Sequence, residues 1–221
     1  MTKRLKHIYF FFKFDLKTSG FIFFLPIIML AASVFQLLIQ NSQQETDIYN
    51  SIILFQGIYI PFAGWGLMYR LKEMYEDGAS ETLIPYYSSN LIFDISRYLT
   101  IHLIGTIIWC LLFAIKYNIN IIWPINIIHF FLLTLLFMFL GTALISAIRN
   151  IEFSLTILFI YLVIEIATLG EYMPWPHVFI YQSGVWDIGL KIKFIFISIY
   201  IIILFCTTLI YIKRNTSKFK D

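Results

Sequence analysis

The chain has 221 residues, of which 60% are hydrophobic and 13% are charged, with a formal net charge of +3 and a mean hydropathy of +0.81. Soluble domains carry about 25% charged and about 45–50% apolar residues, so a water-soluble core of this size cannot hide so much apolar surface. The net charge is too small to indicate a nucleic-acid partner. The composition therefore predicts an all-α, polytopic membrane protein, whose apolar surface is accepted by lipid.

Residues 1–19 are predicted to form an amphipathic helix that lies in the membrane interface. Apolar side chains recur at helical spacing on one face of this segment, and Lys6, Lys13 and Lys17 share the other face. Such a face of lysines favours the anionic headgroups of a membrane. The alternative is a frayed lead-in to the first span. A cleavable signal peptide is not predicted, because Lys13, Asp15 and Lys17 interrupt what would be its apolar region.

Six runs of about 20 mostly apolar residues each predict a membrane-spanning helix. They cover residues 21–39, 52–69, 95–115, 125–148, 153–169 and 194–212. If both termini are cytoplasmic, 13 of the 16 Lys and Arg residues fall on inside segments and 3 fall outside. Because inside loops carry the excess of Lys and Arg, this orientation in the cell membrane is the predicted one.

Small residues in two of these spans predict places where helices approach closely. Gly57, Gly64 and Gly66 lie in the second span together with Pro61, and Gly141 lies in the fourth. Small side chains let helices approach closely in lipid, so we expect these residues to serve helix packing rather than to line a substrate path.

Residues 70–94 form the longest predicted cytoplasmic loop. Its acidic residues are Glu73, Glu76, Asp77, Glu81 and Asp94. Gly78 and Pro85 are expected to break the loop into short pieces, and a Ser or Asn at positions 88–90 is expected to cap the next helix.

Glu165 lies within the fifth predicted span, and Glu171 ends that span on the outer side. A carboxylate inside a membrane helix is costly and usually faces the bundle interior or a wet path. Glu165 is therefore a candidate functional residue, with Lys191 or Lys193 as its candidate partner. The alternatives are a carboxyl that stays hydrated near the outer surface, or one that is protonated.

Residues 170–193 are predicted to lie on the outer side. Pro174 and Pro176 cannot continue a helix, yet their flanks are apolar and aromatic. The segment is therefore expected to dip back into the outer leaflet, where irregular backbone must be covered by protein or face a wet cavity. A loop on the headgroups is the alternative, because Trp and Tyr favour the interface. The candidate substrate-path or gating residues are Glu165, Glu171, Pro174, Pro176 and His177.

Motifs for catalysis or nucleotide binding are absent from the sequence. There is no GxxxxGK[ST], no HExxH and no GxSxG, and the four histidines are scattered. The chain is therefore predicted not to be an enzyme and to hold no metal or cofactor.

The stretch from Glu73 to Ser89 resembles the cytoplasmic loop of ABC-2 type permeases, the membrane subunits of a class of ABC exporters. Those proteins carry an acidic residue, a Gly, a Glu-x-Leu and then a Pro or Ser stretch in this place. The corresponding residues are Glu76, Gly78, Glu81, Leu83, Pro85 and Ser88. The small size and the Ile, Phe, Asn and Lys usage are similar to peptide-export and bacteriocin-immunity permeases of Gram-positive bacteria, such as the staphylococcal exporters of phenol-soluble modulins.

The resemblance implies a coupling helix that docks on a separate cytoplasmic ATPase subunit, where ATP is hydrolysed. The residues given an ATPase-coupling role by the resemblance are Glu73, Glu76, Gly78, Glu81, Leu83 and Pro85. It also implies a second permease subunit, identical or paralogous, and an outer turn that closes the exit for an amphipathic peptide or lipid-like cargo. The alternative for the loop is an ordinary solvated connector. The alternative for the chain is a substrate-capture subunit of an energy-coupled importer, with the small residues Ala31, Ala32 and Ser33 of the first span as its partner contact.

Overall fold

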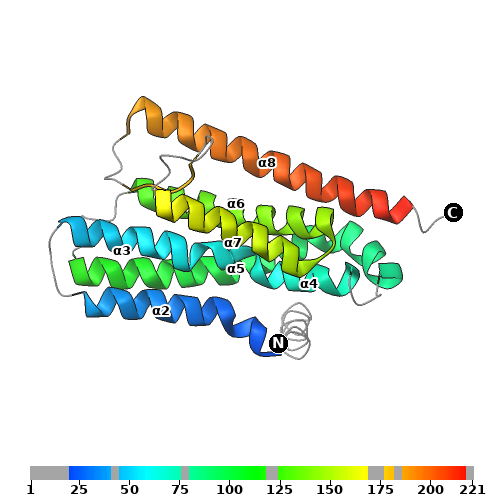
Figure 1. Ribbon diagram of the computed structural model, residues 1–221, viewed down its shortest axis with the longest axis horizontal. Coiled ribbons are helices and arrows are strands. Elements are labelled where there is room, and N and C mark those ends of the chain that lie inside the picture. Colours follow the sequence, from blue (N-terminus) through cyan, green and yellow to red (C-terminus); the bar gives the residue numbers. More distant parts are fainter. Residues whose placement is uncertain are drawn as a thin grey trace, which may run out of the picture.

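The parts of the chain that the structure describes are built from helices, with no strand among them. The computed structural model describes residues 20–40, 45–75, 80–117, 124–168, 177–181 and 186–217. In chain order (Figure 1) the elements are η1 (Gly20–Phe24), α2 (Leu25–Ile39), α3 (Glu45–Ile58), η2 (Ile60–Gly64), α4 (Trp65–Tyr75), α5 (Ser80–Tyr117), α6 (Pro124–Ile148), α7 (Ile151–Thr168) and α8 (Ile188–Ser217).

Six helical stretches are long and apolar enough to cross a membrane. They are Gly20–Ile39, Asp47–Tyr75, Asn90–Tyr117, Pro124–Ile148, Ile151–Thr168 and Ile188–Ile212. Each predicted span overlaps one of them, so the all-helical, multi-pass architecture is confirmed. The orientation and the identity of the membrane stay predictions from the Lys and Arg distribution.

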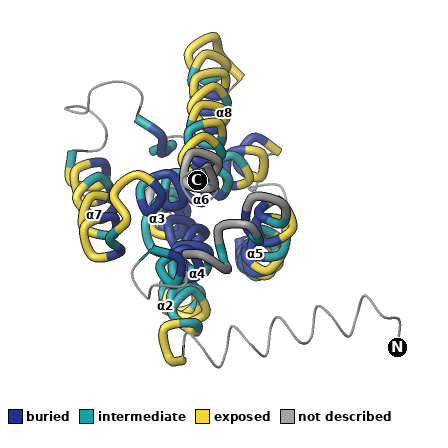
Figure 2. The backbone as a smooth tube through the Cα atoms, turned by 90° about the vertical axis from the view of Figure 1, so that its right-hand side faces the viewer, coloured by how far each residue is buried: buried dark blue, intermediate teal, exposed yellow. Residues whose placement is uncertain are grey.

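Two of the spans form the centre of the bundle and the other four surround them. Figure 2 shows α3, α4 and α6 in the middle, largely buried, with exposed faces on α2, α5, α7 and α8 pointing outward. These outward faces are apolar, as contact with lipid tails requires. In Figure 1, α4 and the first turns of α5 lie at the same end of the bundle as the C-terminal end of α8, and α7 ends at the opposite end.

The second span is interrupted in its middle by a buried 3-10 turn, Ile60–Gly64. Pro61 has no N–H group and cannot continue an α-helical ladder at this point. Gly64 allows η2 to approach α6, because a Cβ atom here would lie 2.8 Å from a backbone oxygen of that helix. A Cβ atom at Gly141 would lie 2.6 Å from the sulfur of Met68. The predicted packing role of the small residues is confirmed at these two glycines.

Stacked rings join α3 to α5 next to this interruption. Phe55 stacks on Trp109 with ring centroids 4.0 Å apart, and Tyr59 stacks on His102 at 4.1 Å. The Tyr59 hydroxyl donates a hydrogen bond of 2.8 Å to the carbonyl oxygen of His102. The room for this hydroxyl comes from Gly105, where a Cβ atom would lie 2.1 Å from it. Buried aromatic pairs of this kind add stability beyond their apolar area.

The prediction that Pro85 breaks the segment 70–94 and that a new helix starts at positions 88–90 is wrong, whereas the predicted break at Gly78 lies outside the described residues. Residues 70–75 are the last turns of α4, and residues 80–94 are the first turns of α5. Pro85 does not end a helix, and no new helix starts at positions 88–90. Pro85 is the sixth residue of α5, where a proline removes one backbone hydrogen bond and crowds the carbonyl four residues back, and burial of residues farther along α5 outweighs that cost. The buried residues that hold this part of α5 against the bundle are Tyr87, Leu91 and Ile95.

Several predicted features lie outside the described residues. They are the interfacial helix over residues 1–19 with Lys6, Lys13 and Lys17, the loop residues Glu76 and Gly78, and the outer residues Glu171, Pro174 and Pro176. For Glu81 and Pro85, the backbone alone belongs to the described part.

Candidate functional site

A short non-helical segment, residues 177–181, lies inside the bundle near the end of α7 and the start of α8 (Figure 1). Val178 is 4% exposed and Phe179 is fully buried. Backbone N–H and C=O groups that are buried outside a helix or sheet need other partners. Here the partners are side chains from four helices, which we call the cradle: Gln56 of α3, His129 of α6, Glu165 of α7 and Lys193 of α8.

Glu165 is fully buried and faces the interior of the bundle rather than a hydrated surface. Its Oε1 atom accepts two backbone hydrogen bonds, from the N–H of Val178 at 2.9 Å and from the N–H of Phe179 at 3.0 Å. Tyr181 closes the far end of the segment, because its hydroxyl donates to the backbone carbonyl of Glu165 at 2.7 Å. A carboxylate that accepts two N–H groups forms bonds stronger than those between neutral groups.

The other three cradle side chains bind the remaining main-chain groups. Gln56 binds both groups of Ile180: its Nε2 donates to the carbonyl and its Oε1 accepts from the N–H, each at 3.1 Å. The Nε2 atom of His129 lies 2.7 Å from the carbonyl oxygen of Val178. Lys193 donates to the carbonyl oxygen of Phe179. Every N–H and C=O group of residues 178–180 is thus bonded to a cradle side chain.

Two of the residues predicted for this site meet in the structure: His177 is the first residue of the segment 177–181, and Glu165 binds the backbone of that segment. Of the two candidate lysine partners, Lys193 is half-buried and interacts electrostatically with Glu165, whereas Lys191 is exposed. Burial, and then the carboxylate of Glu165, raise the pKa of Tyr181, so its hydroxyl stays protonated and able to donate.

An apolar groove of about 330 Å³ runs from the cradle along α6, between α7 and α8. Its lining consists of Leu136, Leu140, Leu144, Ile157, Leu158, Tyr161, Val178, Ile197, Tyr200 and Leu204. Val178 belongs to this lining and also to the segment that the cradle holds. The polar cradle and the apolar groove are therefore parts of one continuous site.

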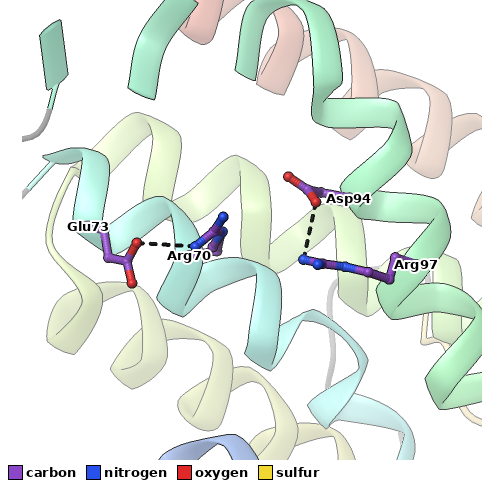
Figure 3. Close-up of polar contacts among 4 residues, drawn as sticks. All are labelled: Arg70, Glu73, Asp94 and Arg97. Carbon is purple, nitrogen blue, oxygen red and sulfur yellow. Dashed lines mark ion pairs between the residues drawn. The ribbon is translucent and has the colours of Figure 1, made fainter. Parts of the chain in front are cut away.

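At the opposite end of the bundle, four charged residues lie between α4 and α5 (Figure 3), and we call them the charge cluster. Arg70 pairs with Glu73 at 3.5 Å, and Asp94 pairs with Arg97 at 3.1 Å. Arg70 is 6% exposed and Asp94 is fully buried. Charges removed from solvent to this extent are retained only where they are paired.

Aromatic rings connect the charge cluster to its surroundings. The guanidinium of Arg97 lies 4.8 Å from the ring centroid of Tyr98, and that of Arg149, in the turn between α6 and α7, lies 5.9 Å from the ring of Tyr75. Tyr87 is buried beside the cluster, and this burial raises the pKa of its hydroxyl. The contact of Arg149 with Tyr75 thus joins the α6–α7 turn to the end of α4, and Tyr87 of α5 interacts electrostatically with Arg70 and Glu73 of α4.

Two residues with a predicted ATPase-coupling role are described in this region. Glu73 is a member of the charge cluster, and Leu83 is half-buried and packs against the core. Within the described ranges, His, Cys, Asp and Glu residues form no group of three or more that could hold a metal ion. No family model, curated protein or solved structure matches the chain.

Proposed function

We propose that this chain is the membrane-spanning permease subunit of an ATP-driven exporter of the ABC-2 type. It works with a separate cytoplasmic ATPase and with a second permease subunit, identical or paralogous, and its cargo is an amphipathic peptide or a lipid-like molecule. The observation that carries the proposal is the acidic motif over residues 73–89, which joins two spans at the end of the bundle that the Lys and Arg distribution assigns to the cytoplasm.

The helices on either side of the motif are suited to transmit a push from the ATPase. α5 is one helix of 38 residues, about 57 Å long at 1.5 Å per residue. In the charge cluster each ion pair lies within one helix, and Tyr87 in the first turns of α5 interacts electrostatically with Arg70 and Glu73 in the last turns of α4. The 3-10 turn Ile60–Gly64 separates α4 from α3, so α4 and α5 can tilt together while α3 keeps its own hydrogen bonds.

The far end of the bundle supplies the exit gate in this proposal. Residues 177–181 cover the end of the apolar groove through Val178, and cradle side chains from α3, α6, α7 and α8 hold them in place. A relative movement of these helices changes the spacing of the cradle and thereby releases the segment.

The proposal is tested by altering the motif and measuring both ATPase binding and export. We expect Glu81→Lys, and deletion of residues 78–83, to abolish capture of a co-expressed ATPase from a neighbouring reading frame and to abolish export, while membrane insertion is retained. Glu152→Lys is the matched control, because Glu152 is exposed in the first turn of α7 at the same end of the bundle. Undiminished ATPase capture by both altered motifs contradicts the docking role.

One observation favours the substrate-capture subunit of an importer as a second candidate. Ala31 and Ala32 are exposed on α2, where close approach by another membrane subunit is unhindered. In that arrangement the ATPase is reached through the other subunit. Glu81→Lys then leaves assembly intact, whereas Ala32→Trp disrupts it.

A further inference from the structure

We propose that the cradle of Gln56, His129, Glu165 and Lys193 is a binding site for the main chain of an extended peptide, occupied in this structure by the chain's own residues 177–181. This inference rests on the proposed function and narrows it, because it makes the cargo a peptide rather than a lipid-like molecule.

The cradle side chains bind main-chain groups of the segment, and the Tyr181 hydroxyl adds one bond to the backbone of Glu165. Its bonds reach the N–H and C=O groups of Val178, Phe179 and Ile180. Gln56 binds both groups of one residue, which is what a neighbouring strand does in a β-ladder. Recognition through main-chain bonds is independent of sequence, so another extended peptide presents the same groups.

The burial of the cradle restricts what can replace the segment. Glu165 is fully buried, and Lys193 lies beside it. Buried charged and polar groups are costly to leave without hydrogen bonds, so the segment leaves readily only when another ligand takes over its bonds. An alkyl chain offers no donors or acceptors, whereas a peptide offers them at the required spacing. The exchange of one main chain for another preserves each bond.

The surroundings of the segment determine which side chains of a cargo peptide fit the site. Val178 projects into the apolar groove, and Phe179 is fully buried with its ring centroid 6.1 Å from that of Phe137. The fitting cargo therefore has two successive apolar residues. Both must carry a free backbone N–H for Glu165, which excludes proline at either position.

Hydrogen exchange on the unaltered full-length chain in lipid nanodiscs tests this inference. The probe is the peptide acetyl-His-Val-Phe-Ile-Tyr-amide, which copies residues 177–181. Its matched control is the same peptide with N-methyl groups on the two amides that face Glu165. A lysophosphatidylcholine serves as the lipid-like probe. The readout is the exchange rate of the chain's own amides at residues 178–180, which rises when the segment is displaced.

We expect the probe peptide to accelerate this exchange and the N-methylated peptide to need about tenfold or more higher concentration, which corresponds to about 1.4 kcal/mol. Equal potency of the two peptides overturns main-chain recognition. Acceleration by the lysophospholipid at the same concentration, or no acceleration by the peptide, also overturns the inference.

Binding of a fluorescent form of the probe supplies a second measurement. Gln56→Leu removes the ladder-like contacts and is expected to weaken binding by about tenfold. Thr134→Val removes a buried hydroxyl that bonds within its own helix, and it should leave binding unchanged. The failure of these experiments is distinguishable from failure of the exporter proposal, because ATPase capture through the motif at residues 73–89 does not involve the cradle.

Discussion

The cradle and the charge cluster both place charged residues deep in the bundle, yet they satisfy them differently. In the cradle, side chains from four helices bind the backbone of a short segment, and Glu165 accepts its two bonds from N–H groups. In the charge cluster, Asp94 and Arg97 bind each other one turn apart on α5. A backbone ligand can be exchanged for another backbone, whereas a buried ion pair has no equivalent replacement. In the proposed exporter, the cradle is therefore the movable end of the molecule and the charge cluster is its rigid end.

The largest expected effect concerns the rigid end. Asp94→Asn removes the negative charge that lies 3.1 Å from the guanidinium of Arg97 inside the bundle, and we expect a loss of about 3–5 kcal/mol in the free energy of unfolding. The measurement is chemical unfolding in detergent followed by circular dichroism. The double variant Asp94→Leu/Arg97→Leu removes both charges and should recover most of this loss. A double variant as unstable as the single one contradicts a role for pairing.

The next largest loss of stability is expected in the cradle, because an amide can replace part of the function of its carboxylate. Glu165→Gln keeps an oxygen acceptor for the N–H groups of Val178 and Phe179 but loses the negative charge, and we expect destabilisation by about 2–3 kcal/mol. Export should fall more than expression does. Glu152→Gln, in the exposed first turn of the same helix, should lie within about 0.5 kcal/mol of the wild type. Equal losses of export and expression in Glu165→Gln would make that residue purely structural.

A matched pair of lysines sharpens the comparison further. Lys193→Met removes the donor to the carbonyl oxygen of Phe179 and the positive charge beside Glu165, so we expect a loss of about 1.5–2 kcal/mol. Lys191→Met changes an exposed side chain two residues earlier on α8 and should have little effect. Thermal unfolding of both variants in the same detergent measures the difference. Indistinguishable melting temperatures of the two variants would show that Lys193 does not help to hold the segment.

The smallest effect is expected at Tyr181. Tyr181→Phe removes one hydrogen bond to the backbone of Glu165 and should cost about 1 kcal/mol. Because burial raises the pKa of this hydroxyl above its unfolded value of about 10, its contribution is fully present below pH 10 and is lost only at higher pH. The stability difference between variant and wild type should therefore be constant from pH 6 to pH 9. A difference that shrinks within this window contradicts the assignment.

The sequence was sufficient to predict the six spans and to single out Glu165, because apolar runs and an acidic residue inside one of them are local signals, although it left open whether that carboxyl faces the interior or a hydrated surface. For the outer segment, irregular backbone covered by protein was one of the predicted alternatives, and the described residues 177–181 are backbone of this kind. Its partners Gln56 and His129 were missed, although an amide and an imidazole inside apolar runs carry the same signal as Glu165.

The charge cluster was missed for a different reason. Arg70 and Asp94 were assigned to a cytoplasmic loop over residues 70–94, in which Gly78 and Pro85 suggested broken backbone. The continuation of α5 through Pro85 depends on packing against the rest of the bundle, which no local pattern contains. The burial of these two ion pairs between packed helices is likewise a tertiary property.

The docking of the α4–α5 connection on an ATPase is tested most directly by site-specific photo-crosslinking in intact membranes. A benzoylphenylalanine replaces Glu81 in one variant and Asp187, next to the first residue of α8 at the opposite end, in the other. We predict a covalent product with the ATPase from position 81 and none from position 187. No product from position 81, or equal products from both positions, would contradict the account.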